Sequence, residues 1–308
     1  MNARAEFVAD RKKGIGGSDA AAVLGLSPWK TPLQLYLEKR GELEDTRQTV
    51  AMEWGTLIEP AIVEMYRRRA GVNVITGEAT KPYVEASLVP FMRCNVDGII
   101  VPEDHAPDEI LEAKLAGNDE DWGEPGTDQV PSYYVPQAQH MLAVSGFARV
   151  KFAVLFARFG LRELQTYTVP RDQELIDMLV DQEREFWQRV VDGNPPDPTT
   201  PEEIRLRWPS DRGTSIEATI GIVATVALLA QAKLEKKRAD EREEDYAAAV
   251  KNFMGDNAEL TYQGRTICTW RQNRPTAQFD RDALALELPD IVAKYTGTRP
   301  GNRPLLVK

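Results

Sequence analysis

The sequence predicts a mixed α/β (α+β) domain, in which helices flank a central mixed sheet, followed by a helical and hairpin extension. Three observations support this prediction. Residues 1–192 read as helices, three strands, a helix, two strands and a helix, which is an order typical of such domains. A Pro-rich linker is expected over 193–214. Residues 215–308 open with one long, highly charged helical segment.

Three helices are expected before the first strand. Residues 18–25 begin with Ser and Asp, which are good N-caps, and end in Gly. A second helix is expected over 32–41. A third is expected over 50–70, where apolar residues recur at helical spacing and a Gly follows. These segments should cover the sheet formed by the strands that follow.

The strands are rich in β-branched residues or alternate in polarity, and Pro and Gly punctuate them. Strands are expected over 83–92, 94–101, 109–116, 150–159 and 161–169. Helices are expected over 133–144 and 171–192. Beyond the linker, a helix over 215–254 and a hairpin turning at Gln263-Gly264 complete the chain.

Composition restricts the available chemistry. The chain has 308 residues, of which 42% are hydrophobic and 28% charged, so it can bury a core. Two cysteines and two histidines cannot build a disulfide scaffold or a His-rich metal site, and the Cys spacing fits no zinc motif. Any metal should therefore bind to carboxylates.

No membrane span or secretory signal is expected, because no stretch approaches roughly 18 apolar residues and the first twenty lack an apolar core. We therefore expect a soluble cytoplasmic protein. The net charge of −10 argues mildly against nucleic-acid binding, but electrostatic fields act locally. Basic residues cluster near both ends and at 67–69. The acidic segment 103–128 is either a solvated loop or a site for divalent cations.

Charged side chains recur on two of the expected strands. Asp97 lies on the strand 94–101, while Glu112 and Lys114 lie two residues apart on 109–116 and share one face. If these strands are antiparallel neighbours, Asp97 can face the other two. Converging carboxylates repel each other unless a hard cation such as Mg²⁺ joins them, and Mg²⁺ also binds phosphate oxygens. A Glu-x-Lys pair alone is more often a solvated face.

Glu59 and Gln137 are further candidates. Glu59 lies beside apolar residues in the helix 50–70, either as a surface or cap residue before Pro60 or as a third acid at a metal site. Gln137 and Gln139 lie among Tyr and apolar residues on a later helix. They are either ordinary polar-face residues or groups that bind the nucleophilic water or a DNA backbone.

Asp97, the run Glu112-Ala113-Lys114 and Gln137 match the pattern of PD-(D/E)XK nucleases, although Val96 stands where that pattern has proline. The flanking motifs resemble one branch, the YqaJ-like viral recombinases, which are relatives of phage lambda exonuclease. They occur in family order over about 1–192: Arg11 with IGGSDAAAVLG, SPWKTP, WGTLIEPAIVEMY, NVDG, EAKLA, and YYVPQAQHMLAV followed by SGF.

The resemblance implies a PD-(D/E)XK nuclease core and a role for each matching residue. Asp97 and Glu112 would ligate metal, together with the Ala113 carbonyl, and Glu59 would support a second metal site. Lys114 would position the nucleophilic water, assisted by Gln137. The cofactor would be Mg²⁺, two ions per site, with Mn²⁺ as a substitute.

The start of the chain fits a pocket for a terminal 5′-phosphate. Ser18 opens a helix whose N-terminus attracts anions, Arg11 would complete the pocket, and Asn95 would reach it from a strand. Lys30 and Trp29 are candidates for DNA contact, although Trp29 fits a core position equally well. The alternative is simple helix capping with Arg11 on the surface.

Together these features predict a Mg²⁺-dependent 5′→3′ double-strand DNA exonuclease of phage-type recombination in the bacterial host cytoplasm. It would leave 3′ single strands for a single-strand annealing protein. The resemblance implies a homo-oligomer, such as a trimeric ring. The alternatives are a PD-(D/E)XK endonuclease of restriction or junction type and a non-catalytic DNA-binding module derived from a nuclease. Residues 215–308 match no catalytic motif.

Overall fold

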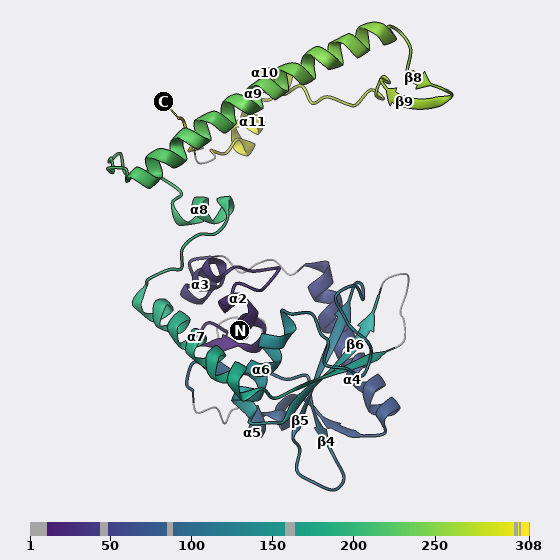
Figure 1. Cartoon of the computed structure of the whole chain (residues 1–308), viewed down its shortest axis with the longest axis vertical. Coiled ribbons are helices and arrows are strands. Elements are labelled where there is room, and N and C mark those ends of the chain that lie inside the picture. The colour runs from purple at the N-terminus through teal and green to yellow at the C-terminus, as the bar shows by residue number, and fades with distance from the viewer. Residues whose placement is uncertain are drawn as a thin grey trace. The chain divides into compact units, whose positions relative to one another are not determined.

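The computed structural model describes residues 11–43, 49–84, 89–157, 164–298, 301 and 303–307. The chain divides into two compact units, Met1–Arg207 and Trp208–Lys308 (Figure 1). Each unit has its own secondary structure.

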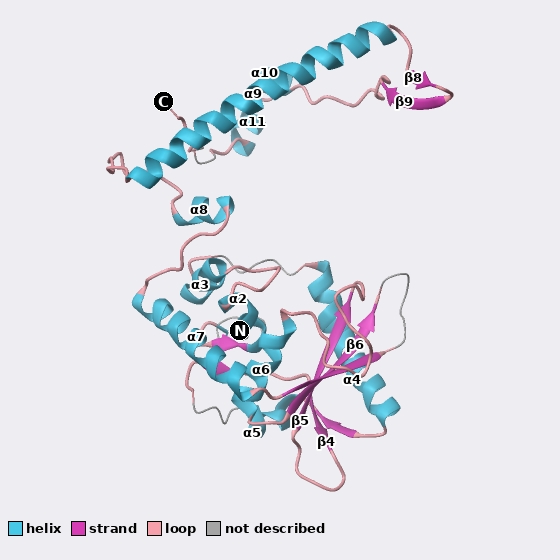
Figure 2. Ribbon diagram, viewed as in Figure 1, coloured by secondary structure: helices cyan, strands magenta, loops and turns pink. Residues whose placement is uncertain are grey.

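A five-stranded mixed sheet forms the centre of the first unit (Figure 2). Its strands, in spatial order, are β2 (Asn73–Ile75), β4 (Gly98–Val101), β5 (Glu109–Ala116), β6 (Arg149–Phe156) and β7 (Gln165–Pro170). Only β5 and β6 pair in parallel, and the other neighbours are antiparallel. A parallel pair needs a crossover, which here contains helix α6 (Tyr134–Ser145).

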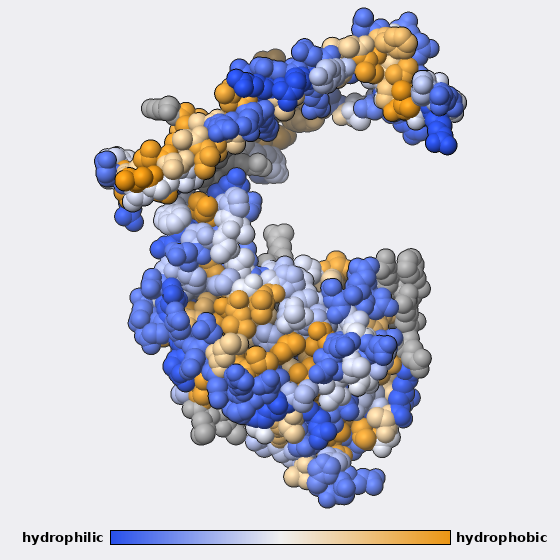
Figure 3. All heavy atoms as spheres, in the orientation of Figure 1, coloured by the Kyte–Doolittle hydropathy of each residue, from blue (hydrophilic) through white to orange (hydrophobic). Residues whose placement is uncertain are grey.

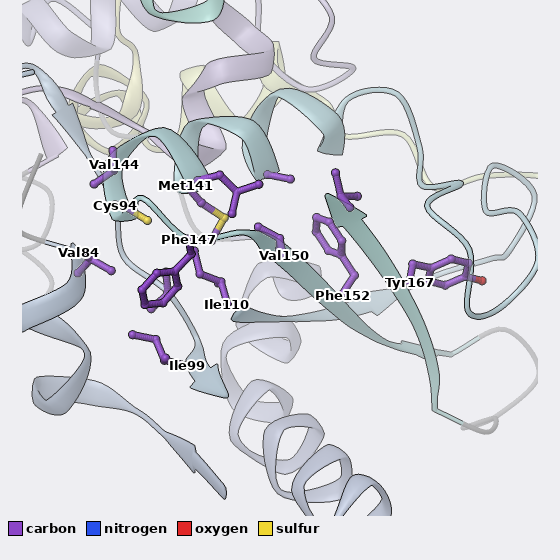
Figure 4. Packing of buried hydrophobic residues seen from close by; sticks show 14 of the residues in the cluster. Val84, Cys94, Ile99, Ile110, Met141, Val144, Phe147, Val150, Phe152 and Tyr167 are labelled. Atoms are coloured by element: carbon purple, nitrogen blue, oxygen red, sulfur yellow. The ribbon is translucent and has the colours of Figure 1, made fainter. Parts of the chain in front are cut away.

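Alternating side chains of the central strands pack on opposite faces of the sheet. On one face, Val150 and Phe152 of β6 join Met141 and Val144 of α6 in the largest buried cluster (Figure 4). On the other face, Ala153 and its strand neighbours pack against helix α4 (Val50–Ala70). The sheet is therefore covered on both sides, as expected for strands that are apolar along most of their length.

A second layer of helices packs on α6. Helix α2 (Gly17–Val23) and helix α7 (Gln173–Asp192) both contact α6, and α7 also contacts helix α3 (Pro32–Arg40). Gly17 permits the α2–α6 contact, because a Cβ atom there would lie only 3.2 Å from Cγ of Met141. The parallel pair β1 (Ile15–Gly16) and β3 (Met92–Arg93) holds the start of α2 in place.

Short elements complete the first unit: the 3₁₀ helix η1 (Gly77–Thr80), helix α5 (Lys81–Val84) and helix α8 (Pro201–Arg207). Glu203 of α8 is fully buried and accepts hydrogen bonds from the backbone amides of Thr199 and Thr200. It also accepts one from the hydroxyl of Thr31, the N-cap of α3. The segment predicted as a linker thus contains a helix that belongs to the first unit.

The second unit is built on one long helix, α9 (Ile220–Met254). A hairpin of β8 (Glu259–Tyr262) and β9 (Arg265–Thr269) follows, and then the short helices α10 (Arg281–Glu287) and α11 (Pro289–Tyr295). Met254 is the single buried hydrophobic residue among the described residues of this unit. Apolar atoms consequently lie at the surface along α9 (Figure 3).

The structure confirms the predicted mixed α/β class and most predicted elements, with a few corrections. The strand predicted over 83–92 is wrong, because Lys81–Val84 is helical and, among its described residues, only Met92 pairs in a strand, β3; residues 85–88 lie outside the described ranges. The strand predicted over 94–101 is shorter and begins at Gly98. Among the described residues, no helix combines the length and apolar character needed to cross a bilayer.

Candidate active site

Three polar side chains from β5 and α6 meet at the centre of the sheet. The carboxylate oxygen Oε1 of Glu112 accepts hydrogen bonds from Nζ of Lys114 at 2.8 Å and from Nε2 of Gln137 at 2.7 Å. Lys114 also donates to Oε1 of Gln137 at 3.4 Å. Glu112 and Lys114 share a face because they alternate along β5, and that face is the one α6 covers. The three groups form a closed hydrogen-bonded triangle.

Asp97 reaches the same place from the position just before β4. The antiparallel register pairs Gly98 with Leu111, so Asp97, which precedes Gly98, lies beside Glu112, which follows Leu111. Oδ2 of Asp97 accepts a hydrogen bond from the backbone amide of Ala113 at 2.8 Å. Burial, together with the negative charges of Glu112 and Glu59, raises the pKa of Asp97 to about 8. The site therefore concentrates more negative charge than it neutralises.

Glu59 of α4 is the third acid of this group. Burial and the charge of Glu112 raise the pKa of Glu59, although its hydrogen bond with the side chain of Asp97 acts in the opposite direction. The cap prediction for Glu59 is not supported, since α4 begins at Val50 and Glu59 lies well inside it. Pro60 follows it within the same helix. Three acids, one from α4, one just before β4 and one from β5, thus interact electrostatically.

The donor set suits a hard divalent cation. The raised pKa of two acids shows that their charges repel, and a cation would relieve this repulsion. Across the described ranges, no group of three or more His, Cys, Asp or Glu side chains is arranged to hold a metal ion by itself. Asp97 and Glu112 would supply part of a coordination shell that water completes, which is how Mg²⁺ commonly binds to proteins.

Lys114 is held as an ammonium ion. Burial alone would lower its pKa, but the adjacent Glu112 carboxylate raises it above the ordinary value, with further contributions from Tyr134 and Asp97. Its Nζ lies 5.0 Å from the centre of the Tyr134 ring, a cation–π distance. Lys114 can therefore donate hydrogen bonds and positive charge at neutral pH. It is less suited to remove a proton.

Tyr134 is a residue of this site that sequence reasoning did not assign a role. Its position three residues before Gln137 places both on one face of α6, which is the signal that identifies it. Gln139, by contrast, contacts backbone: it donates to the carbonyl of Pro170 and accepts from the amide of Asp172. Gln139 therefore fastens the start of α7 to α6.

Arg11 and Ser18, two of the residues expected to hold a 5′-phosphate, lie beside Asp19 rather than beside Asp97 and Glu112. Nη2 of Arg11 lies 2.8 Å from Oδ1 of Asp19 and 3.4 Å from Oγ of Ser18. Lys39 donates to Oδ2 of Asp19 at 2.6 Å. Burial would raise the pKa of Asp19, but Lys39 and Arg11 lower it to about 2. The sequence offered no sign of this network, in which Arg11 and Lys39 both bind the buried carboxylate of Asp19.

The remaining candidates differ in their surroundings. Asn95 is exposed, two residues before Asp97. Lys30 forms an ion pair with Glu38 of α3, at 2.5 Å. Trp29 is 70% exposed, so the core position considered for it is wrong. The structure thus groups Asp97, Glu112, Lys114, Gln137 and Glu59, with Ala113 bonded to Asp97, and it places Arg11 beside Ser18.

A mixed sheet that brings two acids, a lysine and a glutamine together is the arrangement predicted for a PD-(D/E)XK nuclease core. Residues 6–148 match the YqaJ-like viral recombinase domain. The uncharacterized protein YqaJ of Bacillus subtilis strain 168 is 30% identical over 307 residues, covering 94% of this chain and 90% of that protein. The chain therefore belongs to the YqaJ-like viral recombinase family.

Two solved structures are similar at lower identity. The alkaline exonuclease LHK-Exo of Laribacter hongkongensis is 18% identical, with a TM-score of 0.49, covering 62% of this chain and 94% of that one. A phage-related exonuclease of Haemophilus somnus 129PT is 13% identical, with a TM-score of 0.42, covering 58% of this chain and 96% of that one.

Proposed function

We propose that this protein is a Mg²⁺-dependent 5′→3′ double-strand DNA exonuclease that leaves 3′ single strands. The observation that carries the proposal is the convergence of Asp97, Glu112, Lys114 and Gln137 at the centre of the sheet. Membership of a viral recombinase family supports a DNA substrate. Acids that repel one another beside a fixed ammonium suit hydrolysis of a phosphodiester better than binding alone.

The side chains would divide the work as follows. Asp97, Glu112 and the Ala113 carbonyl would hold a first Mg²⁺, and Glu59 would support a second, with Mn²⁺ as a substitute. When bound, the cations polarise phosphate oxygens and make water more acidic. Lys114 would position the attacking water and stabilise negative charge on the phosphate, because its pKa keeps it protonated. Gln137 would fix the positions of the Lys114 and Glu112 side chains through its hydrogen bonds to both.

A pocket for the 5′-terminal phosphate would use Arg11 and Ser18, which already lie together, with Asn95 and Lys30 as further DNA contacts. The planar fork of an arginine matches phosphate oxygens. The network with Asp19 and Lys39 would hold Arg11 in place. A preference for 5′-phosphorylated ends is the expected consequence.

The proposal extends to assembly and location. We place the protein in the bacterial host cytoplasm, where a single-strand annealing protein would receive its product. A homo-oligomer, such as a trimeric ring, would keep the enzyme on its substrate. Exposed apolar residues along α9 are compatible with such an assembly. We further propose 1–192 as the nuclease domain, 193–214 as a connection and 215–308 as an extension.

One digestion experiment tests the proposed activity. The wild type, with Mg²⁺, should degrade linear duplex and spare relaxed closed circles, and EDTA should stop the reaction. Asp97→Asn and Glu112→Gln, which keep side-chain size but remove charge, should abolish digestion while retaining the fold by circular dichroism. Cleavage of the closed circle would instead indicate an endonuclease. DNA binding without Mg²⁺-dependent digestion would indicate a non-catalytic module.

A further inference from the structure

Three aromatic rings connect Lys114 with the protein surface. The Tyr134 ring, which lies against Lys114, is 4.6 Å from the Tyr133 ring, measured between centroids. Trp29 packs edge-on against Tyr133 at 4.8 Å and lies 6.4 Å from Tyr134. We call Trp29, Tyr133 and Tyr134 the aromatic row. It begins at the ammonium group of the candidate active site and ends at a 70% exposed indole.

The turn that carries Trp29 is fixed on both sides. The amide of Trp29 donates to the hydroxyl of Ser27 at 3.3 Å. Two residues later, the hydroxyl of Thr31 caps α3 by accepting from the amide of Gln34. The indole is therefore presented by an ordered turn, with one edge contacting Tyr133 and most of its surface in water. Such exposure leaves a large apolar area unburied, which favours a ligand with a flat apolar face.

We propose that Trp29, supported by Tyr133, stacks on a nucleobase of the strand that is cleaved. Every base has a π-face, so aromatic stacking binds DNA without regard to sequence. The two ring distances place Trp29 within about 11 Å of Nζ of Lys114, or about three steps of 3.4 Å along a DNA strand. The stacked base therefore belongs to one of the three nucleotides nearest the scissile phosphate. This inference rests on the proposed function.

Equilibrium binding separates this inference from the nuclease activity itself. The affinity of the full chain for a labelled duplex with a frayed 5′ end is measured in EDTA by fluorescence anisotropy. Trp29→Ala should weaken binding roughly ten-fold, which corresponds to about 1.4 kcal/mol. Trp29→Phe should recover most of the loss. The control is Trp208→Ala, which removes a comparably exposed indole, 51%, from the second unit. Its affinity should equal that of the wild type.

A substrate series identifies the stacked base. Abasic sites are placed singly at the first three nucleotides of the 5′ end, and both wild type and Trp29→Ala are measured. At one of the three positions, the wild type and Trp29→Ala should bind the abasic substrate with equal affinity, because the base that stacks on Trp29 is missing. A Trp29→Ala protein with unchanged affinity, or a defect that persists on all three abasic substrates, would overturn the proposal. A lower oligomeric mass of the Trp29→Ala protein than of the wild type would also overturn it, because Trp29 would then lie at an interface between subunits.

If the wild type binds and stacks DNA but does not digest it, the proposed function fails and this inference stands. If it digests DNA while Trp29→Ala binds normally, the inference fails alone. The two results are read from different assays and do not depend on each other.

Discussion

At the scale of single residues, Lys114 contacts three side chains of the candidate site. It donates to Glu112 and Gln137 and lies over the Tyr134 ring. Its raised pKa means that its charge is present throughout the neutral range. The role that fits this state is electrostatic, acting on the water and the phosphate as negative charge develops.

Lys114→Met should therefore lower kcat by about 10²–10⁴-fold, with a much smaller change in DNA affinity. The matched control is Lys151→Met. Lys151 lies on the neighbouring strand β6 and forms an ion pair with Glu109 of β5. Single-turnover digestion and equilibrium binding measure the two effects. If Lys114→Met lost affinity and kept its rate, Lys114 would be a phosphate contact only.

Arg11 sets the expected preference for phosphorylated ends. The wild type should digest 5′-phosphorylated duplex faster than 5′-hydroxyl duplex, and Arg11→Ala should reduce this ratio of initial rates. Ser18→Ala should reduce it less, since one neutral hydrogen bond is worth about 0.5–1.5 kcal/mol. Asp19 keeps its partner Lys39 in both variants, so the fold should persist.

The control for Arg11 is Arg189→Ala on α7. Arg189 is 39% exposed and paired with Glu185, whereas Arg11 is 40% exposed and paired with Asp19. Its rate ratio should match the wild type. An unaltered ratio in Arg11→Ala, with a loss of thermal stability in Ser18→Ala, would show that these residues only support the start of α2.

At the scale of elements, a buried ion pair connects α6 with α7 and β3. Nδ1 of His140 lies 2.8 Å from Oε1 of Glu183, and Nε2 lies 2.8 Å from the carbonyl oxygen of Arg93. Both ring nitrogens face acceptors, so the ring is best satisfied as an imidazolium. Burial lowers the pKa of His140, but Glu183 and the Arg93 carbonyl raise it above 6.5 overall.

This pair should make stability depend on pH. Because folding raises the pKa of His140, its contribution is fully present below about pH 6.5 and is lost as pH rises through the folded-state pKa. Glu183→Gln should destabilise the protein by about 1–3 kcal/mol at pH 6 and should flatten the decline toward pH 9. Urea unfolding at several pH values measures both effects. If the free energy of unfolding fell with pH equally in the wild type and in Glu183→Gln, the His140–Glu183 pair would not be the cause of the pH dependence.

The sequence predicted elements best where one signal dominated. Helical spacing with a terminal Gly located α4 and α7 within two residues at each end, and alternation located β5 at Glu109–Ala116. The errors lie in segments whose secondary structure is determined by tertiary contacts. β2 has only three residues, too few for a pattern, and it forms because it pairs with β4. The segment before β3 has β-branched residues, yet Lys81–Val84 is helical and packs against α6.

The candidate site likewise contains residues whose positions the sequence predicted and residues whose positions depend on tertiary structure. Period-two spacing was enough to place Glu112 and Lys114 on one face, and the order of strands placed Asp97 near them. The approach of Glu59 from α4 depends on how that helix crosses the sheet, which no local pattern records. The Arg11–Asp19–Lys39 network likewise joins residues up to 28 positions apart, which spacing rules do not reach.

At the scale of the whole molecule, the three buried clusters all lie between residues 15 and 190. A chain of residues 1–207 should therefore fold independently, with an unfolding midpoint close to that of the corresponding transition in the full chain. Calorimetry of both chains measures this. Aggregation or loss of cooperative unfolding in 1–207 would show that its core needs the second unit.

The second unit should carry self-association. Its exposed apolar residues along α9 include Ile220, Ile222, Val223, Val226 and Leu228. Patches of this kind mark interaction surfaces in soluble proteins. Light scattering after size exclusion should give an oligomeric mass for the full chain and a monomeric mass for 1–207. An oligomer that survives truncation would place the interface in the first unit.

The hydrogen bond from the Ala113 amide to Asp97 offers a way to follow the site without any turnover. A backbone proton exchanges with deuterated solvent only when its hydrogen bond opens. A divalent cation held by Asp97 would restrain the carboxylate that protects this proton, so exchange at Ala113 should slow as the cation is added. One amide in the middle of β5 thus reports how fully the protein is loaded, even in a variant that cannot cut DNA.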